Sequence, residues 1–101
     1  NDIKGWNYHR EMTLNLVVPM GKVTFVIYDD RKKSHSKGVF FKVSLSSSNY
    51  KRLTVPPKLW MAFKGGDVNT NLILNIANIV HDPNEIKKLH LNKIPYNFES
   101  I

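Results

Sequence analysis

The chain of 101 residues contains no cysteine. This absence excludes a disulfide framework and a thiolate metal site, and it is compatible with a cytoplasmic location. The sequence has no run of about 18 apolar residues, so we expect no membrane-spanning helix. It also lacks the basic and then apolar start of a secretory signal peptide. We therefore expect a cytoplasmic protein without a membrane partner, long enough to form one hydrophobic core.

Several signatures of enzyme chemistry are also missing. Gly65-Gly66 has the spacing of neither a P-loop nor a dinucleotide-binding fingerprint, and there is no G-x-S-x-G elbow. The eight acidic residues form no obvious pair. None of the histidines stands in an H-x-H or H-x-x-x-H pair, so we expect no preformed metal site. The histidines are His9, His35, His81 and His90.

The charge is unbalanced, with a net value of +7 and a pI of about 9.8. Such a charge favours anionic partners: phosphates, nucleic acid or acidic membranes. The basic residues form three groups, at residues 31–37, 51–52 and 87–88, of which only the first resembles a patch. We favour solvated loops and strand faces as the explanation of this charge over a binding patch. The ordered aromatic and basic pattern of nucleic-acid modules is absent, so nucleic acid is not the partner that we expect.

Apolar residues alternate with polar ones in several segments, which is the pattern of half-buried β-strands. These segments are Met12–Val18, Lys22–Tyr28, Val39–Leu45 and Leu53–Val55. A turn at Gly21 separates the first two, and this arrangement predicts a hairpin. Pro56 and Pro57 end the fourth, because proline lacks the N–H that a strand ladder needs.

The C-terminal part of the chain has weaker patterns. Thr70–Val80 fits a helix by its asparagine spacing, but its neighbours are strands and Asn is a poor helix former, so we predict a strand. Asp82–Glu85 is typical of a helix or turn start, and Glu85–Leu89 allows at most two helical turns. The tail from Asn92 is expected to be irregular. Six or so short strands predict an all-β sandwich or barrel.

Two places carry candidate chemistry. His9 lies between aromatic and basic residues, where a histidine with a pKa near neutrality could move protons, although a partly exposed strand histidine explains the pattern equally well. Trp60 and Met61 follow the two prolines. They could line an apolar pocket, but we favour a place in the core.

Three ordered motifs lie between residues 29 and 57. They are D-x-R-x-x-S-x-S-x-G from Asp29, L-S-x-x-N from Leu45, and L-x-V-P-P from Leu53. Together they resemble the dTDP-4-dehydrorhamnose 3,5-epimerase family, which carries D-x-R-x-x-S-x-T-x-G, L-S-x-x-N and P-P-G in the same order and spacing. Lys4-Gly5-Trp6 is similar to the R-G-L that opens the active-site strand of the family. The similarity extends over residues 4–85.

The resemblance implies an antiparallel, jelly-roll-like cupin barrel, here with a short C-terminal helix or turn, that is usually dimeric. It implies a nucleotide-linked 4-keto-6-deoxysugar as substrate. The reaction is proton abstraction next to a carbonyl and return from the opposite face, and it needs no metal or organic cofactor. We expect one domain over residues 1–101. We expect this domain to be a cupin-like barrel without the strands that usually precede R-G-L-H in the family.

The positions that perform the chemistry in the family differ here. The general base of the family is the His of R-G-L-H-Y-Q, where this chain has Asn7, and His9 stands at the Gln. The acid of the family is a Tyr on a late strand, at the position of Asn75. Lys4 replaces an Arg and keeps its charge.

The segment that reads P-P-G-F-A-H-G-F in the family also differs. Lys58 replaces its Gly, and Met61 replaces its His. Two hypotheses follow. The first is an isomerase with His9 as the base and substrate-binding residues at Lys4, Asn7, Trp60 and Asn75. The second is a catalytically inactive cupin that acts as a binding or assembly module.

Overall fold

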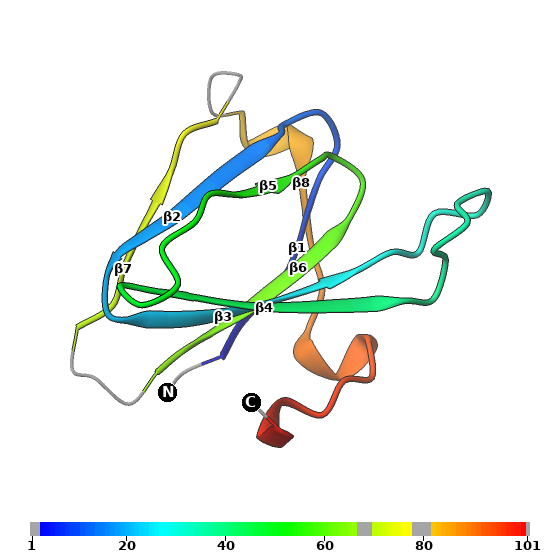
Figure 1. Ribbon diagram of the computed structural model, residues 1–101. Coiled ribbons are helices and arrows are strands. Elements are labelled where there is room, and N and C mark those ends of the chain that lie inside the picture. The colour runs from blue at the N-terminus through cyan, green and yellow to red at the C-terminus, as the bar shows by residue number, and fades with distance from the viewer. Residues whose placement is uncertain (1–2, 67–69, 78–81, 101) are drawn as a thin grey trace.

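The computed structural model of the protein describes residues 3–66, 70–77 and 82–100. In these ranges the chain forms eight β-strands and three short 3₁₀ helices (Figure 1). The strands are β1 (Ile3–His9), β2 (Leu14–Met20), β3 (Lys22–Tyr28), β4 (Phe40–Ser46), β5 (Leu53–Val55), β6 (Trp60–Gly65), β7 (Leu72–Asn75) and β8 (Ile86–Lys88). The 3₁₀ helices are η1 (Pro83–Glu85), η2 (Leu91–Lys93) and η3 (Phe98–Ser100). Within the described ranges, no helix has the length and apolar character needed to cross a membrane.

The strands form two sheets that face each other (Figure 1). The five-stranded sheet has the order β4-β3-β6-β1-β8, and the three-stranded sheet has the order β5-β2-β7. The paired strands are antiparallel, as β3 shows in its pairing with both β4 and β6. The predicted all-β antiparallel fold is therefore confirmed.

The main core lies between the sheets, and most of its buried apolar residues come from β2 and β3. Its buried residues are Met12, Leu14, Leu16, Val18, Val23, Phe25, Ile27, Leu45, Val55 and Met61. A second cluster covers the outer face of the five-stranded sheet: Trp6, Val26 and Ala62 pack against Ile94 and Phe98 of the C-terminal segment. This segment, coloured orange to red, lies outside the barrel (Figure 1). Strand β3 is thus buried on both faces, which explains why its sequence is apolar almost throughout.

The predicted hairpin at Gly21 is wrong, because β2 and β3 lie in different sheets. Gly21 turns the corner between them with a φ of 83°. The backbone N–H of Lys22 donates to Oδ1 of Asn71 at 2.8 Å. A Cβ on Gly21 would lie only 2.2 Å from that same oxygen. The corner is therefore docked against Asn71, and it has room only for glycine.

The helical turns predicted for Glu85–Leu89 are also wrong. After η1, the segment Ile86–Lys88 is a strand that pairs with β1, so tertiary pairing outweighs local helix preference here. Thr70–Val80 contains the predicted strand at Leu72–Asn75, while residues 78–80 lie outside the described ranges, as does His81. The C-terminal tail has only short 3₁₀ turns.

Candidate functional site

Strand β1 presents three of the predicted site residues toward the barrel interior. Lys4 pairs with Phe63 and Asn7 with Met61, so β1 advances three positions where β6 advances two. This bulge lies at Gly5, where a Cβ would come within 2.5 Å of the Ala62 Cβ. Directly paired residues share a face of a sheet. Lys4 and Asn7 therefore lie on the inner face.

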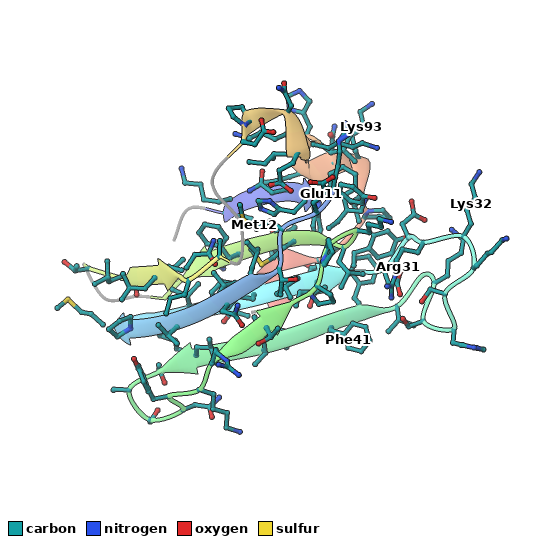
Figure 2. All side chains as sticks on the ribbon, turned by 90° about the horizontal axis from the view of Figure 1, so that it is seen from above. Glu11, Met12, Arg31, Lys32, Phe41 and Lys93 are labelled. Atoms are coloured by element: carbon teal, nitrogen blue, oxygen red, sulfur yellow. The ribbon has the colours of Figure 1, made fainter. Side chains whose placement is uncertain are left out.

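His9 lies two positions beyond Asn7, on the same inner face of β1. Its Nδ1 forms a hydrogen bond with Oε1 of Glu85, and its side chain is 16% exposed. Glu85 is only 5% exposed. Its other oxygen, Oε2, accepts the backbone N–H groups of Glu11 and Met12, both at 3.2 Å. The loop after β1, where Figure 2 labels Glu11 and Met12, thus closes around the carboxylate.

The electrostatics of this pair favour an ionised Glu85. Burial by itself raises the pKa of the Glu85 carboxyl, but the hydrogen bonds from His9 and from two backbone amides outweigh it. The net result is a Glu85 pKa below its ordinary value. A carboxylate that accepts the N–H at Nδ1 fixes the tautomer of an imidazole and leaves Nε2 as a proton acceptor. The pair can therefore act as a general base.

Sequence reasoning missed Glu85. It interpreted residues 82–85 as a helix or turn start, and Glu85 lies 76 positions after His9 in the chain. In the structure, the side chain of Asp82 accepts the N–H of Asn84 at 3.0 Å, and this cap starts η1. The backbone N–H of Arg10 then donates to the carbonyl of Glu85 at 2.7 Å. In the sequence, the only sign of this arrangement is the Asp82 cap of a turn that comes just before a strand.

Asn75 lies in the other sheet, where it pairs with Leu16 of β2. Its Oδ1 accepts the backbone N–H of Asn15 at 3.2 Å, so this amide holds strands together. Neither His9 nor Asn75 lines the hollow beside residues 88–93, the one at residues 31–36, or the one between Tyr8 and Trp60. The roles of Lys4, Asn7 and Asn75 toward a substrate therefore stay predictions.

Trp60 lies on the opposite face of the sheet from His9. It pairs with Tyr8 and Tyr28 and packs against the outer cluster. Its neighbour Met61 is buried in the main core, as we favoured from the sequence. Trp60 instead lines a shallow outer hollow of about 230 Å³. It therefore does not join the group around His9.

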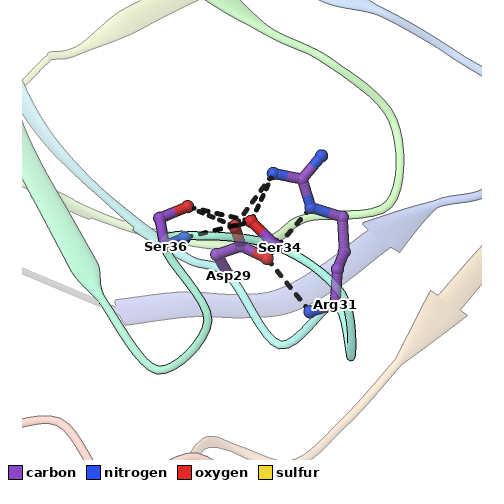
Figure 3. Close-up of polar contacts among 4 residues, drawn as sticks. All are labelled: Asp29, Arg31, Ser34 and Ser36. Carbon is purple, nitrogen blue, oxygen red and sulfur yellow. Dashed lines mark hydrogen bonds and ion pairs between the residues drawn. The ribbon is translucent and has the colours of Figure 1, made fainter.

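The first of the three motifs, residues 29–38, forms a loop that is held by hydrogen bonds to Asp29 (Figure 3). Asp29, at 1% exposure, accepts hydrogen bonds from the backbone N–H, Nε and Nη2 of Arg31, at 2.9–3.0 Å. The hydroxyls of Ser34 and Ser36 donate to the same carboxylate. The pKa of Asp29 lies far below its usual range, and the side-chain hydrogen bonds from Arg31 are the largest cause. Gly38 closes the loop with a φ of 85°.

Residues in or next to the other two motifs form hydrogen bonds to backbone carbonyls. The side-chain amide of Asn49 donates to the carbonyl of Ser44 at 2.7 Å and closes the loop after β4. Lys58 takes a positive φ of 70°, and its N–H donates to the carbonyl of His9 at 2.7 Å. The turn after the prolines thus fixes the backbone of the candidate base.

Comparisons with known proteins place these features in context. No protein-family model matches the chain. A probable low-salt glycan biosynthesis epimerase from Haloferax volcanii, Agl13, is 26% identical over 95 residues. The match covers 93% of this chain and 59% of that protein, so the chain spans about three fifths of the relative's length.

Solved structures are also similar to the chain. A dTDP sugar isomerase from Desulfovibrio desulfuricans G20 has a TM-score of 0.93 and 30% identity, over 99% of this chain and 66% of that one. A dTDP-4-dehydrorhamnose 3,5-epimerase from Bacillus anthracis, solved with TDP and PPi bound, has a TM-score of 0.81 and 20% identity, over 93% and 56%. The second likeness shows the fold alone. The predicted cupin-type barrel is confirmed.

Proposed function

Because this chain is a divergent dTDP-4-dehydrorhamnose 3,5-epimerase-like cupin, we propose that it acts on a nucleotide-linked 4-keto-6-deoxysugar. The proposed reaction is an isomerisation by proton abstraction and return next to the carbonyl. One observation carries this proposal: the hydrogen-bonded pair of His9 and buried Glu85 on the inner face of β1. The names of the relatives, a glycan biosynthesis epimerase and a dTDP sugar isomerase, support the same reaction class.

In the proposed mechanism, Nε2 of His9 takes the proton from the carbon next to the carbonyl. The electron pair of that C–H bond moves onto the carbonyl oxygen and forms an enolate. Glu85 stabilises the imidazolium that results, as a positioning residue. Lys4 and Asn7 lie on the same face of β1 and can donate hydrogen bonds to the enolate oxygen. Asn75 cannot act as an acid, so the proton returns to the opposite face from solvent.

We also propose the cytoplasmic location and the homodimer that the family resemblance implies. No metal or organic cofactor enters this mechanism, since each step needs only a base, a hydrogen-bond donor and water.

A second candidate function, a binding module without catalysis, rests on Met61. This residue stands where the family has a histidine, and it is packed in the main core opposite Asn7. The interior around the candidate base is therefore more apolar than the family motif implies. A cupin of this kind would bind the nucleotide sugar and leave its C–H bonds intact.

Solvent-deuterium exchange into a dTDP-4-keto-6-deoxyhexose distinguishes the two functions. We expect the protein to exchange deuterium at a carbon next to the carbonyl, and His9→Gln to lower the rate by about 10²–10⁴-fold. His90→Gln is the matched control, because His90 is an exposed histidine on which the mechanism does not depend. Binding of the sugar without exchange by the unaltered protein would favour the module.

A further inference from the structure

The outer hollow near Trp60 has an aromatic floor. Tyr8 of β1 and Trp60 of β6 are directly paired, and their ring centroids lie 5.0 Å apart with the planes tilted by 45°. Both side chains are partly exposed. The Nζ of Lys87 lies 5.0 Å from the centroid of the Tyr8 ring, within the range of a cation–π contact. The floor thus offers ring faces to a ligand, with a cation beside them.

The rim of this hollow carries an excess of positive charge. Arg31, Lys58 and Lys87 line it together with Asp30. The Asp30 carboxylate already pairs with Lys37 at 2.9 Å. In residues 3–66, 70–77 and 82–100, neither Lys58 nor Lys87 has a carboxylate partner. Figure 2 shows Arg31 on the loop that projects beyond the strands, on the side of the molecule where Lys32 also lies.

Lys58 occupies its place at a conformational cost. Its φ of 70° is in the left-handed region, which is unfavourable for a residue with a Cβ. The family motif P-P-G has glycine at this position, where the same backbone carries little cost. Strained backbone of this kind tends to persist where the side chain has a function. Here the side chain in question is a lysine that lines the aromatic hollow.

We propose that this hollow binds an organic phosphate attached to a ring, such as a nucleoside monophosphate. The phosphate would lie between Lys58 and Lys87, and the ring would stack on Trp60. At about 230 Å³ the hollow is smaller than the roughly 300–1,000 Å³ of typical ligand pockets, so it would take up the phosphate and one face of the stacked ring and leave the rest of the ligand in solvent. It lies on the opposite face of the sheet from His9, so this site is separate from the one proposed for catalysis.

Tryptophan fluorescence provides the test, because the chain has two tryptophans and one of them, Trp6, is 0% exposed. We would titrate the whole chain with AMP, adenosine and inorganic phosphate. AMP is expected to change the Trp60 emission saturably and to bind more tightly than either of its parts. Lys58→Gly and Lys87→Gln should each weaken AMP binding by about tenfold, the effect of losing one charge-assisted hydrogen bond.

Two control variants make the outcome specific. Lys51→Gln removes the same charge from an exposed position outside the hollow and should leave AMP binding unchanged. His9→Gln should also leave it unchanged, whatever its effect on deuterium exchange. The proposal is overturned by the absence of saturable AMP binding, by an equal loss of affinity in Lys51→Gln, or by loss of AMP binding in His9→Gln. Equal affinity for AMP and inorganic phosphate would overturn the role of Trp60.

Discussion

Replacement of Lys58 by glycine should stabilise the protein. The left-handed φ of 70° costs a residue with a Cβ about 1–2 kcal/mol relative to glycine. Glycine also lowers the free energy of unfolding by about 0.4–1 kcal/mol, because it has more conformational freedom in the unfolded chain. At the middle of these two ranges, the net gain in the free energy of unfolding should be about 0.8 kcal/mol. For a chain of this size, this gain corresponds to a rise in Tm of about 3–6 °C.

Thermal and urea unfolding, followed by circular dichroism, measure this gain. Lys58→Ala is the matched control, since it removes the same charge but keeps the Cβ, so it should show no comparable rise in Tm. An equal rise in Lys58→Ala would refute the argument from backbone strain, and so would a fall in Tm in Lys58→Gly. Loss of AMP affinity together with higher stability in Lys58→Gly would show that the lysine is kept for binding.

Three further predictions concern stability. Asp29→Ala should lower the free energy of unfolding by about 2–4 kcal/mol in urea titrations, because a buried carboxylate with five hydrogen bonds is lost while Arg31 can still reach water. Because the folded-state pKa values of Asp29 and Glu85 are lowered, their contribution is complete above their ordinary pKa values of 3.8 and 4.5. It is lost as the pH falls below them, so Tm should decline with falling pH from about 4.5, and less steeply in Asp29→Asn. Gly21→Ala should cost at least about 2 kcal/mol, and Gly38→Ala only about 1 kcal/mol, because a Cβ would collide with Asn71 in the first and meets open space in the second.

The strands with alternating apolar residues were predictable because one face of each packs in a core. Leu14, Leu16 and Val18 are buried as their spacing predicts. The partners of these strands were not predictable in the same way. The Gly21 corner looks like a hairpin in sequence, but β2 pairs with β5 and β7 while β3 pairs with β4 and β6.

The candidate site was predictable only in part. His9 stood out by its aromatic and basic neighbours, and the bulge at Gly5 places it on the inner face together with Asn7. Glu85 is far from His9 in sequence, so no local pattern joins them. Trp60 was assigned to the substrate site by its place after the prolines. Successive side chains of β6 point to opposite faces of the sheet, so Trp60 lies on the outer face and Met61 on the inner face.

The central claim is that the His9–Glu85 pair moves a proton to and from a sugar. The most direct test is the rate of solvent-deuterium exchange into a dTDP-4-keto-6-deoxyhexose by Glu85→Gln. Gln can hold the ring but cannot stabilise an imidazolium by charge, so we predict a loss of about 10²–10⁴-fold. Glu11→Gln, an exposed carboxylate in the same loop, should exchange at the unaltered rate. Equal rates in Glu85→Gln and the unaltered protein would contradict the account.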